Sequence, residues 1–422
     1  MTSSPSPAPA GFRLVQFAPP PQSPPAARAG GAASDCEPSD AIRTFVFMSN
    51  LAAQEATGDE AASVTASRVL TRLKGSNESR VLLFGLVRDA DCPGPRPVGE
   101  VGEFGAPLLP SVELAAGSPH NAEGSAYAEP EYAAFIHLAL PLLEERDTAE
   151  IDLVFDAGYL PVPGEDFDAA GRDVAEAALM TAEQLALACG RHLFHIGTQR
   201  RAAGEETNSD SPEFCPDPVG QIVERRGYTA RLSDVQVEIN VPDNPPVPLL
   251  PRGMECVTWQ DYAIPDEYVP GVLELLTVVS TDADFGGLTV EPINWTRERL
   301  AAARARLQDR RAHTLLTALI RDGEIVSMTE LARHEAADPA VAEWTLTVTA
   351  RGHRHAGLAR TAKTAALARM AEYWPRVRRT YASHSAGDPA MRALDRHLGA
   401  RDLSMARTWE KDVSGRAAQL SR

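Results

Sequence analysis

Ten residues near the middle of the chain, 242–251, contain five prolines and divide the sequence into two long halves. Proline removes a backbone donor and stiffens the chain, so such a segment joins domains rather than lying inside one. The chain has 422 residues, more than a single hydrophobic core usually organises. We therefore expect an N-terminal domain over residues 40–241, a linker over 242–251 and a C-terminal domain over 252–412.

The two halves repeat one order of secondary structure. Helical spacing of apolar residues alternates with short apolar runs in both, as where Val174, Ala178 and Ala182 share one stripe. In the first half we expect helices at 41–51 and 62–73, strands at 79–87, 132–140 and 149–155, a helix at 174–189, and strands at 191–196 and 230–241. In the second half we expect a strand at 253–259, helices at 267–279 and 296–308, strands at 314–320, 325–331 and 344–349, a helix at 358–373, a strand at 378–382, a helix at 389–398 and a strand at 404–409. Each half thus predicts a mixed α/β sheet with one long helix after a central strand.

Residues 1–39 precede these halves and are rich in Pro, Ala and Ser. They lack both the basic and the apolar region of a secretion signal. We expect a mostly disordered tail here, with one candidate strand over residues 12–17, and a second short tail over 413–422.

Composition excludes several classes of function. The formal charge of −17 and the pI of about 5.1 argue against a nucleic-acid-binding protein, which would show clustered Lys and Arg. An acidic surface suits a cationic substrate, but it suits solubility equally well. No apolar run approaches the roughly 20 residues that span a membrane. The five cysteines are scattered without a C-x-x-C pair, which favours reduced thiols in a cytoplasmic protein over disulfides or a zinc site, so no metal is expected.

One stretch of the second half places a strand, a glycine-containing loop and a helix start in succession, over residues 344–363. The first turn of a helix has backbone N–H groups without intrahelical partners and a partial positive charge, so it binds phosphate. Gly357 lets the backbone approach a ligand without a Cβ in the way. Donor and cationic groups are concentrated there on His353, Arg354, His355, Arg360 and Lys363. The predicted ligand is a pyrophosphate.

Two well-known phosphate loops do not fit this stretch. Gly352 and Gly357 have P-loop spacing, but Leu358 and Ala359 stand where that loop needs Lys followed by Ser or Thr. A dinucleotide fingerprint needs G-x-G-x-x-G, and only one of its glycines can be placed here.

The loop does match the acyl-CoA pattern Q/R-x-x-G-x-G/A and in this resembles the GNAT superfamily of N-acetyltransferases. The matching residues are Arg354, His355, Ala356, Gly357, Leu358 and Ala359. Downstream, Met391, Leu394 and Leu398 resemble the family's M…N…LGF segment, and Tyr228 lies in a similar element of the first half. The chain is especially similar to tandem GNAT proteins of the mycothiol-synthase-like kind. The resemblance implies two tandem GNAT acyl-CoA N-acyltransferase folds and acetyl-CoA, or another acyl-CoA, as the cofactor.

The resemblance also implies which residues bind the cofactor. In GNAT enzymes the strand before the loop splays from its neighbour, and its peptide groups align the pantetheine arm. That role falls here to Leu346, Thr347 and Val348. The phosphates fall to the loop at 353–359, with Lys363 one turn into the helix.

Two further residues stand where relatives often have asparagines that touch the cofactor, namely His384 and Asp388. Asp388 also precedes Pro389, and an aspartate followed by proline predicts a helix N-cap and first helical residue. We favour the capping role for Asp388.

Attack by an amine on a thioester requires a group that accepts the amine proton. Histone-type members of the family carry a catalytic Glu eleven residues before the Q/R of the loop, and Glu343 occupies that position. Its alternative role is that of a solvated carboxylate at a strand start. Glu330 on the neighbouring strand is the second candidate.

Acceptor recognition in this fold falls to the first two helices and their connection, here residues 280–298. An acidic, aromatic-bearing group there could receive an amine, and its members are Asp282, Asp284, Glu291, Trp295 and Glu298. Solvated helix ends and loops look the same in sequence, so both interpretations stay open.

The first half departs from the pattern at the corresponding loop, residues 156–168. It has no Arg/Gln-x-x-Gly, and its acidic residues Glu165, Asp166 and Asp168 would repel phosphates. Pro161 and Pro163 remove amide donors. We interpret the first half as a scaffold and expect a monomer in which the two copies form an intramolecular pseudo-dimer.

Together these features predict a cytoplasmic, acetyl-CoA-dependent N-acyltransferase that acts on a small-molecule amine through its C-terminal copy, without nucleic-acid or membrane partners. The alternative is a catalytically inactive or CoA-sensing GNAT-fold binding protein. The family's missing Tyr and Asn support that alternative, and the intact loop at 354–359 opposes it.

Overall fold

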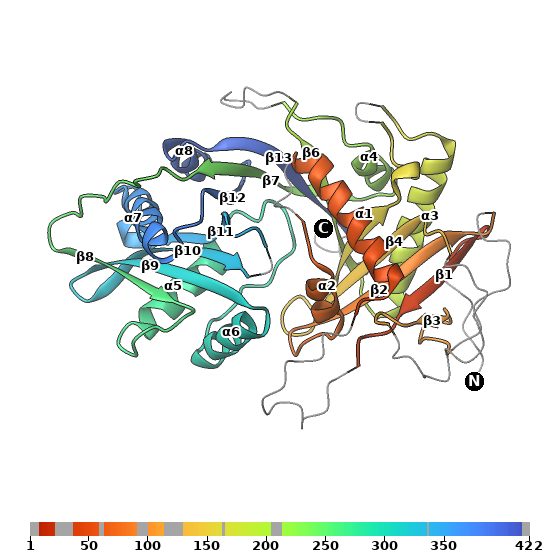
Figure 1. Ribbon diagram of the computed structural model, residues 1–422, viewed down its shortest axis with the longest axis horizontal. Coiled ribbons are helices and arrows are strands. Elements are labelled where there is room, and N and C mark those ends of the chain that lie inside the picture. The colour runs from red at the N-terminus through yellow and green to blue at the C-terminus, as the bar shows by residue number, and fades with distance from the viewer. Residues whose placement is uncertain are drawn as a thin grey trace. The chain divides into compact units, whose positions relative to one another are not determined.

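The computed structural model describes residues 8–21, 37–58, 63–90, 100–113, 130–162, 165–203, 213–335 and 337–415. The chain divides into two compact units with their own strands and helices (Figure 1). Unit 1 contains Met1–Gln199, Cys215–Ala230 and Arg407–Arg422, and unit 2 contains Arg200–Phe214 and Arg231–Ala406. No helix in the described ranges is long and apolar enough to cross a membrane.

Unit 1 is a sheet with helices on both faces. Its elements in chain order are β1 (Phe12–Phe17), α1 (Asp40–Thr57), α2 (Ala66–Leu73), β2 (Ser79–Arg88), β3 (Leu108–Leu109), β4 (Ala134–Pro141), β5 (Thr148–Phe155), the 3₁₀ turn η4 (Ala157–Tyr159), α3 (Ala169–Ala188), β6 (Leu193–Arg201) and α4 (Pro218–Arg225). The strand order is β3-β1-β2-β4-β5-β6, followed by β13 (Arg401–Asp412), whose second half belongs to this unit. β4 and β5 are antiparallel, and β5 and β6 are parallel.

The apolar run of β2 supplies both cores of unit 1. Leu82 and Phe84 pack with α3 and α4, whereas Val81 and Leu83 pack with α1 and α2. Successive side chains of a strand point to opposite faces, so a strand buried on both sides reads as a continuous apolar segment. This is why residues 79–87 show no polar alternation.

Unit 2 repeats the arrangement. Its elements are β7 (Thr229–Asn240), β8 (Met254–Gln260), α5 (Val269–Asp282), α6 (Arg297–Asp309), β9 (Ala312–Arg321), β10 (Glu324–His334), β11 (Val341–Thr349), the 3₁₀ turn η5 (Arg351–His353), α7 (Leu358–Tyr373), β12 (Arg379–Ser385), α8 (Pro389–His397) and the first half of β13. The strand order is β13-β7-β12-β11-β10-β9-β8. Leu316 and Ala318 of β9 pack with α5 and α6, while Leu315 and Leu319 pack with α7.

The last strand of each sequence half crosses from one unit to the other. β7 ends the first half, yet from Arg231 onward it belongs to unit 2, where it pairs antiparallel with β12. β13 ends the second half, yet from Arg407 onward it belongs to unit 1. The compact units therefore differ from the expected ranges 40–241 and 252–412. An alternating apolar pattern shows which face of a strand is buried but does not specify its neighbour.

Most expected elements are present with shifted ends, including the candidate strand at 12–17, which is β1. Of the expected N-terminal tail, residues 1–7 and 22–36 lie outside the described residues. α4 is a helix that the sequence pattern did not predict, although Asp217 caps it, accepting a hydrogen bond from the Gly220 amide at 2.6 Å, and Pro218 begins it. The cap predicted at Asp388 is confirmed, because its carboxylate accepts from the first amides of α8.

Ile239 on β7 is fully buried in a core that β12 residues share. Because β7 belongs to unit 2, Ile239→Ala should leave a cavity there and lower the free energy of unfolding by about 2–5 kcal/mol. Thr229→Ala at the exposed start of the same strand is the matched control, with an expected change below about 0.5 kcal/mol. Denaturant titration of the full-length protein measures both changes. Equal unfolding midpoints for wild type and Ile239→Ala would contradict this packing.

Candidate functional site

The strands β11 and β12 separate in the middle of unit 2. Their parallel register has only three pairs, Val341 with Arg379, Ala342 with Thr380 and Glu343 with Tyr381. Beyond Glu343, β11 continues beside β10 to Thr349, whereas β12 continues beside β7 to Ser385. The sheet therefore has an open, wedge-shaped edge along the second half of β11.

A β-bulge accounts for this separation. The register of β11 against β10 shifts between Glu330 and Leu331, which pair with Leu346 and Trp344, so Thr345 is an extra residue. A bulge bends its strand and increases the local twist, and bulges occur preferentially beside functional sites. The side chains of Thr345 and Leu346 consequently do not alternate between the two faces of the sheet as they would in a regular strand.

The peptide groups at the open edge can be assigned from the hydrogen-bond pattern. The Ala350 amide donates to β10 at 2.9 Å, and the carbonyls of Leu346 and Val348 accept hydroxyl hydrogen bonds from β10. Peptide directions alternate along a strand, so the amide and carbonyl of Thr347 face the opposite edge. Of the three residues predicted to align a pantetheine arm, Thr347 is the one whose peptide groups are directed to where β12 has departed.

The loop after β11 leads through η5 into α7. Gly357 is the N-cap of α7 and adopts a left-handed backbone with φ of 76°, and no side chain among the described residues caps this helix. The first-turn amides of α7 therefore lack the side-chain acceptor that most helices provide. Leu358 is buried and fixes the helix start, while Arg354, His355 and Ala356 are exposed. The strand, the loop and the helix start thus follow one another as expected, and anion binding there stays a prediction.

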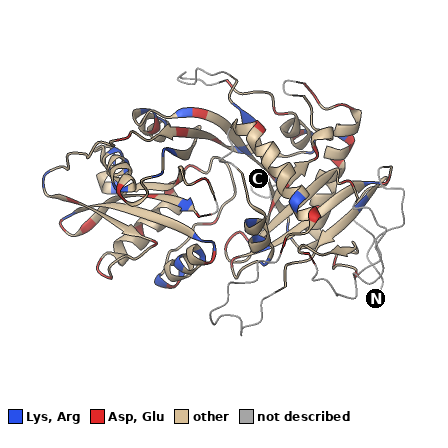
Figure 2. Ribbon diagram, viewed as in Figure 1, with Lys and Arg blue, Asp and Glu red and all other residues tan. Residues whose placement is uncertain are grey.

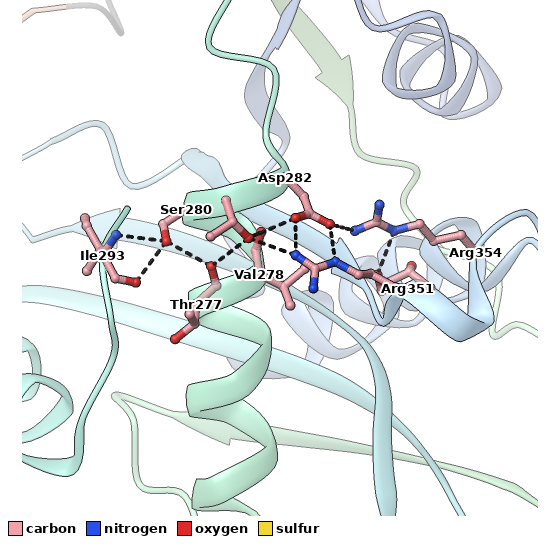
Figure 3. A network of polar contacts seen from close by, with 9 residues as sticks. Thr277, Val278, Ser280, Asp282, Ile293, Arg351 and Arg354 are labelled. Carbon is pink, nitrogen blue, oxygen red and sulfur yellow. Dashed lines mark hydrogen bonds and ion pairs between the residues drawn. The ribbon is translucent and has the colours of Figure 1, made fainter. Parts of the chain in front are cut away.

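Two arginines of the loop share one carboxylate, as Figure 3 shows. Arg351 donates to Asp282 from Nε at 2.8 Å and from Nη2 at 2.5 Å, and Arg354 donates from Nη2 at 2.6 Å. Arg354 Nε also donates to the Thr349 carbonyl at 3.3 Å. These hydrogen bonds, that of Arg351 first, hold the pKa of Asp282 well below its usual range.

Each of three residues in the group predicted to bind an amine acceptor has a partner within unit 2. Asp282 binds the loop arginines, and Asp284 accepts from the Ser385 hydroxyl at 2.6 Å and the Gly286 amide at 2.9 Å. Trp295 packs against the core beneath α5 and α6. The connection between α5 and α6 is thus attached both to the loop after β11 and to the end of β12, and all three of these residues have structural partners.

Two predicted cofactor residues are buried in a separate cluster. The Lys363 ammonium donates to Asp395 at 2.7 Å and lies 4.7 Å from the centre of the Trp344 ring, with 1% of its side chain exposed. His384 Nδ1 lies 2.9 Å from the other oxygen of Asp395. Burial lowers the pKa of Lys363. Because α7 directs Lys363 and β12 directs His384 into the interior, neither side chain reaches the exposed loop.

The two candidate bases have contrasting surroundings. Glu343 is exposed. Glu330 is 3% exposed and accepts from the Thr345 hydroxyl at 2.5 Å, across the bulge. Burial raises the pKa of Glu330, against hydrogen bonding by Thr345 and Tyr262. Buried carboxyl groups with raised pKa values are frequent general bases.

The matching loop of unit 1 has the opposite electrostatics. Asp168 caps α3, accepting from the Gly171 amide at 2.7 Å, and Asp156 accepts from the Gly158 amide at 2.8 Å. Carboxylates of the loop itself therefore occupy amides that would face an anion. Glu165 and Asp166 are exposed, and Pro163 lies outside the described residues.

Sequence reasoning missed four residues of this region: Tyr262, Thr345, Arg351 and Asp395. Arg351 lies three residues before the motif and was detectable as a further loop cation. Thr345 depends on a bulge, and Tyr262 and Asp395 are distant in sequence from Glu330 and Lys363, so no local signal marks them. Figure 2 shows that the cations of unit 2 extend to α6, which has four arginines.

Comparison with known proteins gives a consistent fold. No protein-family profile and no curated sequence matches the chain. Among solved structures, a tandem GNAT protein from the clavulanic acid biosynthesis pathway, solved without AcCoA, aligns with a TM-score of 0.60 and 16% identity over 95% of this chain and 98% of its own. A GCN5-related N-acetyltransferase from Sphaerobacter thermophilus aligns with a TM-score of 0.52 and 15% identity over 96% of each chain. At these identities the likeness concerns the fold, and it confirms the expected pair of tandem GNAT folds.

The buried cluster leads to a stability prediction. Lys363→Met removes the cation and leaves the Asp395 charge buried, which should lower the free energy of unfolding by about 3–5 kcal/mol. Arg360→Met, exposed in the same helix, is the control and should change it by less than about 0.5 kcal/mol. If Lys363 instead bound phosphate, its substitution would weaken CoA binding and leave the unfolding midpoint nearly unchanged.

Glu330 leads to a pH-dependent prediction. Its folded pKa is raised, so above the unfolded pKa of about 4.3 the folded state resists ionisation and stability falls as pH rises. Glu330→Gln removes this effect while keeping an acceptor for Thr345. Its gain in stability should be near zero at about pH 4 and grow towards neutral pH, by about 1.4 kcal/mol for each unit of pKa shift. Thermal melting across pH measures the difference; a gain independent of pH would contradict it.

Proposed function

We propose that this protein, whose chain has two tandem GNAT folds, transfers an acetyl group from acetyl-CoA to an amine of a small molecule, and that the reaction takes place in unit 2. One observation carries the proposal. The bulge at Thr345 opens the edge of β11 directly before a loop that presents exposed arginines and the uncapped start of α7. In the described part of the matching loop of unit 1, by contrast, the Asp168 carboxylate caps α3.

The residues present suit the chemical parts of CoA. Pyrophosphate requires backbone amides and cations, which the first turn of α7 and the side chains of Arg351 and Arg354 offer. The pantetheine arm carries amide groups, and Thr347 offers an amide and a carbonyl at the open edge. Bound acetyl-CoA supplies an acyl group activated as a thioester. Lys363 and His384 are omitted from this set because they bind Asp395 in the interior.

Glu330 is the proposed proton acceptor. Thr345 fixes one carboxylate oxygen, and the carboxylate keeps lone pairs for a proton from the attacking amine. Burial raises the pKa of the group towards the pH at which a general base is most effective. The exposed carboxylate of Glu343 has no such environment, and we propose Glu330 in its place.

The test is release of free CoA from acetyl-CoA, followed with a thiol reagent over a panel of small amines. Glu330→Gln should lower kcat by roughly 10²–10⁴ and leave acetyl-CoA affinity nearly unchanged, because the base acts after binding. Glu343→Gln is the matched control and should retain most of the wild-type rate.

Two outcomes would contradict the proposal in different ways. A protein that binds acetyl-CoA but turns over no amine would be a CoA-binding module. If Glu343→Gln is inactive while Glu330→Gln is fully active, Glu343 on β11 is the general base and the proposed role of Glu330 is wrong.

A further inference from the structure

Asp282 is held in an ion triad with the two exposed arginines of the loop after β11 (Figure 3). Arg351 donates hydrogen bonds to both carboxylate oxygens of Asp282, and Arg354 donates to one of them. The Asp282 side chain is 18% exposed, whereas those of Arg351 and Arg354 are 64% and 38% exposed. The carboxylate is thus partly covered by guanidinium groups that remain open to solvent on their other sides.

The place of Asp282 in α5 is electrostatically unfavourable. It is the last residue of the helix, where the partial charge of the helix dipole is negative. An anion is disfavoured there, so the neighbouring cations must stabilise it. Hydrogen bonds from Arg351 first, then from Thr281 and Arg354, keep its pKa low. Asp282 is therefore an anion throughout the neutral range, and the arginines are its counter-charges.

Hydroxyl groups fix the end of α5 against the segment that precedes α6. Ser280 Oγ donates to the Ile293 carbonyl at 2.9 Å and accepts from the Ile293 amide at 3.0 Å. Thr277 Oγ1 accepts from the Trp295 amide at 3.1 Å. Thr281 Oγ1 donates to Asp282 itself at 2.8 Å. The carboxylate is presented to the loop by a fixed scaffold rather than by a freely moving side chain.

We infer that Asp282 is an internal competitor for the pyrophosphate of CoA: in the free protein its carboxylate occupies the arginines that the cofactor's phosphates require. This rests on the proposed binding of CoA by unit 2. Both anions need the same donors, because a carboxylate and a phosphate each accept paired hydrogen bonds from a guanidinium. Binding then exchanges one anion for another, and Asp282 lowers affinity by its repulsion and by the contacts that must break.

The charge balance sets the direction of the effect. Two arginines and one aspartate leave a net charge of +1 at the loop, and removal of the carboxylate charge raises it to +2. Asp282→Asn keeps the size of the side chain and one acceptor oxygen. It should therefore tighten CoA binding, by roughly 5- to 50-fold for a charge at about 5 Å in a partly solvated setting.

The experiment is calorimetric titration of the full-length protein and its variants with CoA and, separately, with inorganic pyrophosphate. The control is Asp266→Asn, because Asp266 likewise accepts a hydrogen bond from an arginine, Arg297, at 3.0 Å. Asp266 precedes α5 and does not belong to the loop between β11 and α7, so its substitution should leave the affinities for CoA and pyrophosphate unchanged. Measurements at about 0.01 M and about 1 M salt add a second readout, since the Debye length falls from about 30 Å to about 3 Å.

The inference expects Asp282→Asn to bind both ligands more tightly than wild type at low salt, with a smaller advantage at high salt. Equal or weaker binding by Asp282→Asn, beside normal binding by wild type, would overturn it, because Asp282 would then only position the arginines. Absence of CoA and pyrophosphate binding in wild type and variant alike would overturn the proposed cofactor site as well. The two failures are thus distinguishable in one set of titrations.

Discussion

The extra residue in β11 is the constraint on which the rest of the candidate site depends. Two parallel strands normally satisfy each other's peptide groups along their whole shared length. The bulge at Thr345 ends that pairing at Glu343 and turns β11 away, so the peptide groups of Thr347 face an open edge. The same residue directs its hydroxyl to the buried Glu330 carboxylate. One backbone irregularity thus supplies both the gap for a ligand and the hydrogen bond that orients the proposed base.

The two units differ in the acidic residue that lies near the start of the helix after the central strand. A helix follows the central strand in each, and its first amides need acceptors. In unit 1 the adjoining Asp168 accepts a hydrogen bond from the Gly171 amide in the first turn of α3. In unit 2 Gly357 offers no side chain, and the nearby anion is Asp282, which comes from α5 and binds the loop arginines. The acceptor in unit 1 therefore comes from the loop before its own helix, whereas the anion in unit 2 comes from another helix.

The buried charges around Asp395 hold the helix that carries this loop. Asp395 of α8 joins Lys363 of α7 to His384 of β12, and all three side chains are at least 98% buried. A buried ion pair contributes little net stability over apolar packing, but breaking it is costly. The cluster therefore favours one placement of α7 against β12 and α8. That placement directs Lys363 inward, whereas Arg351 and Arg354 of the preceding loop are exposed.

The sequence by itself determined what depends on neighbouring residues. Alternating and helical apolar patterns predicted most of the strands and helices in their order, though not α4. Gly357 predicted the loop before α7, and the Asp388-Pro389 pair predicted a helix cap, because backbone dihedrals and caps are local. Only the tertiary structure decided which strand neighbours β12, where β11 bulges, and which charges meet. Lys363 and Asp282 appear equally available in sequence, yet one is buried against Asp395 and the other is bound to Arg351. Partners far apart along the chain are brought together by packing of the whole sheet and its helices, and no local pattern encodes that encounter.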